Sequence, residues 1–333
     1  PGREFSLYLI ELLCSNYSNN TRLTELINNT HISILPSMNP DGFELGQRYN
    51  INGVDLNRDF PDQFTDPNNT LSGRQPETRA LMEWTKSRHF TLSANMHSGA
   101  LVVNYPYDGP NSGYYSASPD DPLFIQLSLA YSIHNSPMYT NNQYNQGITN
   151  GSEWYSIFGG MQDWMYIYEQ GFEITLEQSN TKWPNSNQLS TLWNQNQESM
   201  LSYIEEIHKG VQGIVTDSQT NTPLNANISI SGINHDVHTD PENGDYYRLL
   251  TPGNYVITVS SEGYISQTSS ITVPIVNALV KSFQLVPKET LPPVSGDFNL
   301  DNTINLIDAY ILIEYILTSY ETDLSYDITG DGT

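Results

Sequence analysis

Arg48, Asn57 and Arg58 are the first polar side chains in the sequence whose types and spacing could do chemistry. Two guanidinium groups with an amide nearby can hold a carboxylate through charge-assisted, bidentate hydrogen bonds. Each arginine could equally form a structural salt bridge. The cluster therefore indicates either carboxylate binding or ion pairing, and these residues alone leave the two open.

His97 stands just after a predicted strand, within the segment 94–99. Functional groups often lie where strands give way to loops. A lone histidine is more often structural than a ligand, and the remaining histidines form no HExxH or His-x-His pair. Composition by itself therefore does not establish a metal site.

The segment Phe172–Glu177 alternates strictly between apolar and polar residues, which predicts a strand. Its two faces carry different residues: Phe172, Ile174 and Leu176 on one side, and Glu173, Thr175 and Glu177 on the other. Two interpretations stay open. Either both carboxylates are solvated, or their face lines a pocket and one of them is a candidate general base.

The elements that must position these groups follow from periodicity. Residues 4–14 and 76–88 have the spacing of helices, and the second opens with Pro and Glu, a favourable first turn. Residues 31–35 and 91–95 are predicted as short buried strands. Alternating helices and strands over the first 200 or so residues indicate an α/β domain with a parallel or mixed sheet.

The amino-acid composition changes after a predicted helix that ends near His208. Residues 210–286, here called the β-module, are rich in Val, Ile, Thr and Tyr between turn signals, which predicts a small all-β unit. His235 and His238 fall in a predicted loop of this module and are not expected to be ligands. Residues 287–295 contain several prolines and are predicted to be an extended linker.

The overall charge excludes several classes of partner. Asp and Glu number 37 against 13 Lys and Arg, a formal net charge of −24, which argues against nucleic acid or an anionic membrane as partner. No apolar run approaches the roughly 18 residues of a membrane span. Cys14 is the one cysteine, so an internal disulfide is excluded.

Residues 295–333 hold eight acidic side chains and no Lys or Arg. Such a segment is either a solvated tail or a cation site, and spacing favours the second. Oxygen-bearing residues stand at positions 1, 3, 5, 7, 9 and 12 of a calcium loop: Asp297, Asn299, Asp301, Thr303, Asn305 and Asp308. A predicted helix, 309–317, follows this loop.

These features of the tail resemble a dockerin, a module of paired calcium loop–helix repeats that binds a cohesin on a scaffold or cell surface. Asp327, Thr329 and Asp331 begin a second, truncated loop. Phe298 and Leu300 depart from the small residues usual at their positions. The resemblance implies calcium as a ligand and a cohesin as a partner.

Residues 1–207 resemble the zinc metallocarboxypeptidases, in the regulatory branch that contains carboxypeptidases D, E, M and N. The matching segments occur in family order: Gly2–Glu4, Pro36–Gly42, Asp55–Phe60, Asn95–Gly99, Asn104–Asp108, Asn150–Tyr155, Gly159–Trp164 and Thr175–Glu177. The resemblance implies an α/β domain with a mixed sheet and helices on both faces. It also implies hydrolysis of the C-terminal peptide bond of peptides or proteins.

The resemblance assigns a role to individual positions. His97 matches the second zinc-ligating histidine, and Asn57 with Arg58 matches the pair that holds the substrate's C-terminal carboxylate. Arg48 matches the arginine that polarises the scissile carbonyl and stabilises its oxyanion. Tyr155 matches a mobile tyrosine that closes over the substrate.

Three further positions are implied in the same way. Glu177 matches the glutamate that deprotonates zinc-bound water and then protonates the leaving amine. Asp108 and Gln162 match positions that shape the pocket for the last side chain. An acid there resembles the members that remove C-terminal Lys or Arg, whereas the alternative for Asp108 is a surface turn.

One departure concerns zinc itself. The family's first two ligands come from a His-x-x-Glu motif just before the Gly2–Glu4 match, and the chain begins at Pro1. A catalytic zinc needs about three protein ligands, so we expect this polypeptide by itself to be inactive. N-terminal truncation and a degenerate relative are the two explanations, and truncation is favoured because the other functional positions survive.

The β-module resembles the transthyretin-like domain that follows the catalytic domain in this branch, and we expect it to serve packing and folding. The leading hypothesis is an exported metallocarboxypeptidase that is expected to favour C-terminal Lys or Arg and that carries a dockerin-like tail for attachment. The alternatives are a non-catalytic C-terminus-binding protein and a cellulosome-type scaffold-associated protein. The predicted domains are 1–209 (catalytic), 210–286 (transthyretin-like), 287–295 (linker) and 296–333 (dockerin-like).

Overall fold

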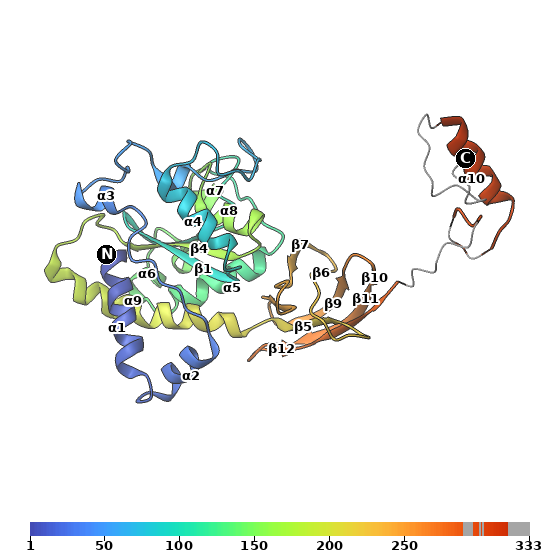
Figure 1. Cartoon of the computed structure of the whole chain (residues 1–333). Helices are drawn as coiled ribbons and strands as arrows, with labels where there is room; N and C mark the ends of the chain where they lie inside the picture. Colours follow the sequence, from blue (N-terminus) through green and yellow to red (C-terminus); the bar gives the residue numbers. More distant parts are fainter. Residues whose placement is uncertain (289–295, 300, 302, 319–333) are drawn as a thin grey trace. The chain divides into compact units, whose positions relative to one another are not determined.

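The computed structural model describes residues 1–288, 296–299, 301 and 303–318. The chain divides into two units. The first consists of Pro1–Glu262 with Ser266–Leu285, and the second of Gly263–Ile265 with Val286–Thr333. The first unit contains the candidate site and most of the β-module, and it is traced in Figure 1 from blue to orange.

A four-stranded mixed sheet forms the centre of the N-terminal domain, with strand order β1-β4-β2-β3. The strands are β1 (Leu92–His97), β2 (Ala100–Tyr105), β3 (Ile148–Asn150) and β4 (Phe172–Ser179). β1 runs parallel to β4, β4 antiparallel to β2, and β2 parallel to β3. Every residue of β4 is buried, as expected of a central strand covered on both faces.

Helices cover the apolar face of β4. Phe172, Ile174 and Leu176 pack in one core with residues of α1, α2, α5 and α9. These helices span Gly2–Asn16, Thr21–Asn29, Asp121–Ser132 and Ser186–Glu205. The predicted helix over residues 4–14 is confirmed as α1, whose buried stripe includes Phe5, Leu9 and Leu13.

A second group of helices lies on the other side of the sheet (Figure 1). α4 (Pro76–Lys86) and α8 (Met161–Tyr168) share a small core built around Leu81, Met82 and Trp164. α4 confirms the helix predicted from its opening Pro and Glu. The remaining helical pieces are short: α3 (Pro40–Glu44), η1 (Leu56–Arg58), α6 (Ser136–Tyr139), η2 (Asn145–Gly147), α7 (Gly151–Trp154) and η3 (Glu206–His208).

One predicted strand is wrong. The segment predicted over 91–95 lies at the start of β1 (Leu92–His97), but residues 31–35 are not assigned to any strand. A strand requires a hydrogen-bonded neighbour. Here residues 31–35 and β1 line the same cavity, of about 1320 Å³, instead of pairing with each other. The apolar alternation of 31–35 therefore did not define a strand.

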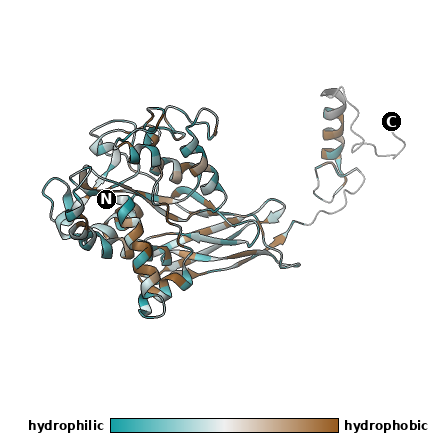
Figure 2. Ribbon diagram, turned by 60° about the vertical axis from the view of Figure 1, so that its left-hand side comes forward, coloured by the Kyte–Doolittle hydropathy of each residue, from teal (hydrophilic) through white to brown (hydrophobic). Residues whose placement is uncertain are grey.

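The β-module consists of two sheets. β13-β5-β12, with β8 against β5, forms one, and β11-β9-β6-β7 forms the other. Figure 2 shows hydrophobic and hydrophilic residues mixed along these strands, as expected of a sandwich with one buried face per sheet. The strand bounds are β5 Val211–Asp217, β6 Asn227–Ile230, β7 Ile233–His238, β8 Asp245–Arg248, β9 Gly253–Ser260, β10 Tyr264–Ile265, β11 Gln267–Val273, β12 Leu279–Val280 and β13 Phe283–Pro287.

His235 and His238 lie in β7, so the loop predicted around them is wrong. β7 pairs antiparallel with β6, and Val237 is buried opposite Ile228. Polar residues occupy most of β7. Because of these polar residues, β7 lacks the apolar–polar alternation from which strands are predicted. Pairing with β6, rather than local propensity, defines this strand.

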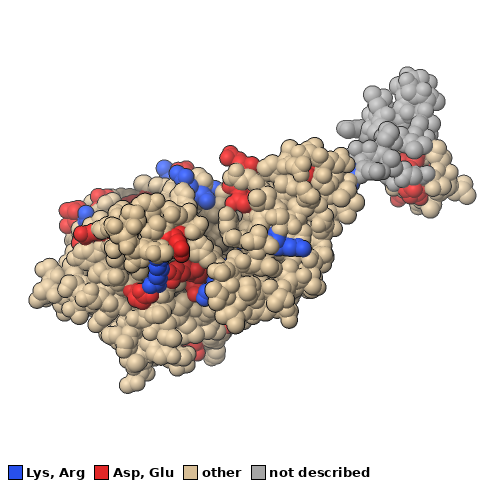
Figure 3. Space-filling model, turned by 90° about the horizontal axis from the view of Figure 1, so that it is seen from below, with Lys and Arg blue, Asp and Glu red and all other residues tan. Residues whose placement is uncertain are grey.

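The tail begins with a loop and continues in helix α10, Leu306–Thr318, which confirms the helix predicted over 309–317. The second predicted calcium loop, at Asp327, Thr329 and Asp331, lies outside the described residues. In the part of the chain that the structure describes, every helix is too short or too polar to cross a membrane. On the face shown in Figure 3, basic and acidic side chains lie in small mixed groups on a largely uncharged surface.

Candidate active site

The pairing of β1 with β4 brings the two most reactive candidates together. In this parallel register His97 at the end of β1 is the Cα partner of Glu177. Ligand sites in open α/β sheets form beyond the carboxyl ends of the strands. The structure therefore places the histidine and one of the two alternating carboxylates at the edge where such a site is expected.

Glu177 has the environment of a general base. Its side chain is 9 % exposed, and its Oε2 atom is buried with no hydrogen-bond partner. Burial raises the pKa of its carboxyl to about 7, although the positive charge of Arg48 opposes the shift. A carboxyl that titrates near neutral pH can both accept and return a proton during a reaction.

His97 is held in its neutral form. Burial and the nearby charge of Arg48 lower the pKa of its imidazole to about 4. Neutral imidazole is the form that binds metals. No group of three His, Cys, Asp or Glu side chains that could hold a metal ion occurs among the described residues. His97 therefore fits one ligand position of a catalytic zinc, and the described residues do not supply the other ligands.

Asp55 connects the two halves of the predicted carboxylate-binding cluster, a role that our sequence predictions missed. Its Oδ2 accepts from Arg48 Nε at 2.6 Å, and its Oδ1 accepts from the backbone N–H of Asn57 at 3.1 Å. One side chain thus caps η1 and orients Arg48, which lies nine residues before Asn57 in the sequence. The N-cap preference of Asp two positions before Asn57 was the available signal.

Asn57 and Arg58 lie together on η1. Asn57 Oδ1 accepts from the backbone N–H of Met161 at 2.9 Å, which ties η1 to the first turn of α8. Arg58 is exposed, and its Nη1 donates to the carbonyl of Asn57 at 2.6 Å. The guanidinium is therefore positioned over η1 and remains open to a ligand.

Asp108 is not a surface turn residue, because only 2 % of it is exposed. Its Oδ1 accepts from Asn104 Nδ2 at 3.1 Å and from Gln162 Nε2 at 2.8 Å. A Cβ added at Gly151 would overlap with Oδ1, and one at Gly160 would lie 3.0 Å from Oδ2. Two glycines therefore make the space that this buried carboxyl occupies.

A second buried acid supports Asp108. Both oxygens of Asp163 accept from the backbone N–H of Asp108, at 2.9 and 3.1 Å. Burial raises the pKa of Asp108 to about 7, opposed by its hydrogen bonds and by the charge of Arg58. Burial and the neighbouring Asp108 raise the pKa of Asp163 well above its ordinary range. The two carboxyls thus oppose each other's ionisation, because they are buried side by side.

Tyr155 follows α7 directly and is 38 % exposed, with its ring 4.8 Å from that of Trp154. An exposed tyrosine with one ring contact has the freedom that closure over a ligand requires. Arg48 lies within electrostatic range of the Tyr155 side chain, so the two side chains lie near each other at the site.

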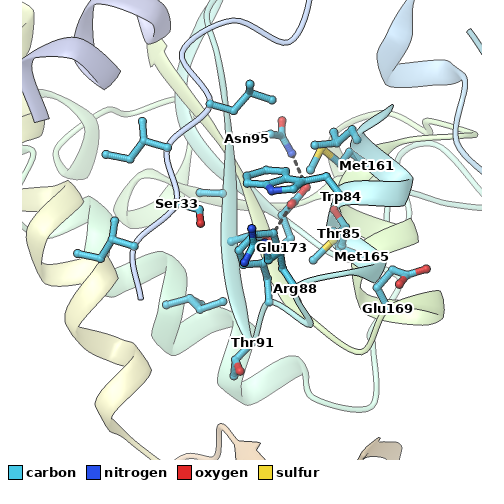
Figure 4. Close-up of a pocket in the computed structure, with 18 of the residues that line it drawn as sticks. Ser33, Trp84, Thr85, Arg88, Thr91, Asn95, Met161, Met165, Glu169 and Glu173 are labelled. Atoms are coloured by element: carbon cyan, nitrogen blue, oxygen red, sulfur yellow. Dashed lines mark hydrogen bonds between the residues drawn. The ribbon is translucent and has the colours of Figure 1, made fainter. Parts of the chain in front are cut away.

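The large cavity reaches only part of this constellation. His97, Arg48 and Asn57 line it, together with Asn95, Trp84 and the residues drawn in Figure 4. Asp108 and Gln162 are not among its lining residues and hydrogen-bond each other. The structure therefore brings the zinc-ligand candidate His97, the oxyanion candidate Arg48 and Asn57 to a common cavity.

Glu173 is the second carboxylate of the alternating strand, and it is fully buried beside the cavity (Figure 4). Its oxygens accept from Ser93 Oγ at 2.6 Å and from Asn95 Nδ2 at 2.8 Å. Burial raises the pKa of its carboxyl to about 7. Both acids of the strand are thus buried, so the interpretation of a solvated face is wrong.

Stability is expected to depend on pH through Glu173. Between its ordinary pKa of 4.5 and about 7, the folded protein keeps this proton while the unfolded chain has released it. The free energy of unfolding therefore falls as pH rises through this window, by about 3 kcal/mol in total. Glu173→Gln should abolish that contribution, measured by denaturant unfolding at several pH values. Glu25→Gln, at an exposed glutamate of α2, is the control, and equal pH slopes for all three proteins would contradict the expectation.

Comparison with known proteins identifies the family of the chain and of its parts. A family model described as zinc carboxypeptidase matches residues 1–199, one described as carboxypeptidase regulatory-like domain matches residues 210–286, and one described as dockerin type I domain matches residues 295–333. The chain belongs to the zinc carboxypeptidase family. The predicted resemblance and the predicted fold class are both confirmed.

Several proteins of known sequence or structure are similar to this chain. Human carboxypeptidase D is 45 % identical over 313 residues, which cover 87 % of this chain and 22 % of that protein. The human carboxypeptidase N catalytic chain is 41 % identical over 335 residues, covering 88 % of this chain and 72 % of its own length. A crystal structure of thrombin activatable fibrinolysis inhibitor matches with a TM-score of 0.45 at 20 % identity, covering 61 % of this chain and 59 % of that one. The chain thus spans about a fifth of the length of carboxypeptidase D.

Proposed function

We propose that this protein hydrolyses the C-terminal peptide bond of peptides or proteins and favours C-terminal Lys or Arg. The observation that carries the proposal is the register that sets His97 opposite Glu177, within the electrostatic reach of Arg48. A base, a metal-ligand candidate and an oxyanion donor converge there. Their convergence is the arrangement that metal-assisted hydrolysis requires.

The clamp would make the enzyme an exopeptidase. Asn57 and Arg58 bind the substrate's terminal carboxylate, because a guanidinium and an amide on one short helix can donate to both of its oxygens. Asp55 holds Asn57 and Arg48 relative to each other. The scissile carbonyl, one residue further from the terminus, then lies toward Arg48.

Arg48 and Glu177 perform the chemical step. Arg48 donates to the carbonyl oxygen as negative charge develops on it, which is worth on the order of 10²–10³ in rate. Glu177 accepts a proton from the attacking water and returns it to the leaving amine. Zinc, when bound with His97 as one of its ligands, supplies Lewis acidity and makes water easier to deprotonate. Tyr155 folds over the substrate and excludes solvent.

Asp108 supports the proposed preference for basic residues. Its carboxylate lies behind the clamp, near enough to Arg58 for the two charges to interact. Asp108 and Gln162, hereafter the specificity pocket, present one negative charge and amide groups to the last side chain of the substrate. A guanidinium or ammonium group would match that charge.

The test of the proposal is a peptide panel. The protein expressed from its complete gene would be assayed on peptides that differ only in a C-terminal Arg, Phe or Glu. We expect release of Arg to be fastest. A preference for Phe would contradict the role of Asp108, and failure to release any residue would contradict the activity itself.

We propose further that the tail binds calcium, attaches the protein to a cohesin, and that the protein acts outside the cell. Asp308 accepts backbone N–H groups of Phe298 and Asn305, each at 2.8 Å, so its carboxylate closes the loop. Asp297 Oδ1 accepts from the N–H of Asp301 at 3.2 Å. These bonds fold the loop back on itself, which supports a calcium loop, although among the described residues no three acidic side chains are already grouped to hold an ion.

Calcium titration followed by calorimetry is expected to show binding that Asp308→Ala weakens at least about tenfold, because the loop loses the ligand that closes its shell. Glu242→Gln, at an exposed acid of the β-module, is the matched control and should bind as the wild type does. Equal calcium affinity in all three proteins would exclude the loop as the site. A cohesin pull-down with and without calcium then tests the partner.

A further inference from the structure

A buried ion pair joins the β-module to the carboxypeptidase domain. Arg248 Nη2 in β8 donates to both carboxylate oxygens of Asp120, at 2.8 and 3.0 Å, and the two side chains are 0 % and 1 % exposed. The guanidinium also lies 5.2 Å from the ring centroid of Phe172. Burying two charges has a large desolvation cost, so an apolar contact would stabilise the domain interface as well as this ion pair does. We therefore consider whether the pair positions other side chains.

Asp120 transmits this contact to α8. Tyr166 Oη donates to Asp120 Oδ2 at 2.9 Å, and the ring of His235 in β7 stacks on Tyr166 with 3.9 Å between centroids. The β-module thus holds this tyrosine twice, by its hydroxyl through Arg248 and by its face through His235. Tyr166 itself is 1 % exposed.

Tyr166 is connected to both residues of the specificity pocket. It lies four residues after Gln162 on α8, and residues with that spacing share one face of a helix. Its ring centroid is 5.9 Å from that of Tyr107, the residue before Asp108. Gln162 Nε2 in turn donates to Asp108 Oδ1 at 2.8 Å. Gln162 therefore lies on the same face of α8 as Tyr166, and Asp108 directly follows a residue that contacts Tyr166.

We propose that Arg248 is a positioning residue for the specificity pocket. Through Asp120 and Tyr166 it fixes the turn of α8 that carries Gln162 and the backbone that carries Asp108. The β-module would then preorganise the pocket for a C-terminal guanidinium or ammonium group. A preorganised pocket binds more tightly, because less conformational entropy is lost when the ligand binds. This inference rests on the proposed function, in which Asp108 recognises the last side chain.

A role limited to packing and folding makes a different prediction. Loss of a stabilising contact lowers the amount of folded protein, which reduces turnover of all substrates by the same factor. Loss of a positioning contact raises KM for substrates that use the pocket and leaves kcat and the other substrates nearly unchanged. The ratio of kcat/KM for a peptide ending in Arg to that for the same peptide ending in Ala separates the two.

The test uses two variants of the protein expressed from its complete gene. Tyr166→Phe removes one hydroxyl and leaves Asp120 paired with Arg248, so the fold is expected to survive. Arg248→Met removes the guanidinium. We expect the Arg/Ala ratio to fall about fivefold in the first and about tenfold in the second, chiefly through KM for the Arg peptide. Arg248→Lys should restore part of the ratio.

Gln170→Asn is the matched control. Gln170 Oε1 accepts from the backbone N–H of His238 at 2.9 Å, a side-chain contact between the same two domains that does not involve the Tyr166 side chain. Its backbone φ of 63° suits asparagine. The control should keep the Arg/Ala ratio of the wild type.

Two results would overturn the inference. An unchanged ratio in Tyr166→Phe, whose fold is verified by thermal unfolding, would show that the network does not reach the pocket. Equal losses for both peptides in each variant would assign the network to stability alone. A wild-type protein without a preference for Arg would instead contradict the proposed function, and with it the premise of a basic-specific pocket.

Discussion

Glu177→Gln is expected to slow peptide hydrolysis about a thousandfold, because general acid–base catalysis by a positioned carboxyl contributes about 10²–10⁴. The amide keeps the shape of the side chain but can neither accept the proton of the attacking water nor return it. Peptide affinity should change little, since the clamp residues Asn57 and Arg58 are untouched. Steady-state kinetics and calorimetric binding of a slowly cleaved peptide would measure the two effects separately.

The neighbouring acid provides the control for this prediction. Glu173 lies on the same face of β4 and, like Glu177, is buried with the pKa of its carboxyl raised to about 7. Its oxygens, however, are occupied by Ser93 and Asn95. Glu173→Gln should therefore retain most of the turnover. Equal losses in both variants would refute the assignment of Glu177 as the sole base.

Asp108→Asn is expected to reduce kcat/KM for peptides ending in Arg by about a hundredfold, because truncating one partner of a buried charge pair costs about 2–5 kcal/mol. Peptides ending in Ala should change by a small factor, since they do not reach the carboxylate. Asparagine keeps the volume of the buried group among Gly151 and Gly160. Competition between the two peptides in one tube would measure the ratio directly.

The pH dependence of that ratio is a second readout for the same variant. The carboxyl of Asp108 ionises with a pKa of about 7, and only the ionised form attracts a guanidinium. The preference for Arg over Ala should therefore increase from about pH 6 to about pH 8 in the wild type. Asp108→Asn should remove this increase. A ratio independent of pH in the wild type would contradict the role of Asp108.

The sequence predicted local elements well and long-range partners poorly. Helical spacing sufficed for α1 and α4, and strict alternation sufficed for β4. The segment 31–35 was predicted as a strand from the same kind of pattern and is not one, because a strand depends on a neighbour that local periodicity cannot specify. β7 was missed for the complementary reason, since its polar residues are held by pairing with β6.

The same limit applies to the site. Most candidate residues could be identified only because their motifs resemble a known family, and the roles assigned to them stay predictions. The contacts that hold them could not be foreseen. Glu173 bonds to Asn95 across 78 positions, and Asp120 pairs with Arg248 across 128 positions. Such pairs arise from tertiary packing, which one sequence without relatives does not encode in any local pattern.

The most direct test of the account is a comparison of two peptides that are identical except at the C-terminus, one a free acid ending in Arg and the other its amide. The protein expressed from its complete gene would be incubated with both peptides, and the masses of the products would be measured by mass spectrometry. The account predicts loss of a single Arg from the acid and no change in the amide, because Asn57 and Arg58 require a carboxylate. Cleavage of the amide, or cleavage of both peptides at an internal bond, would contradict it.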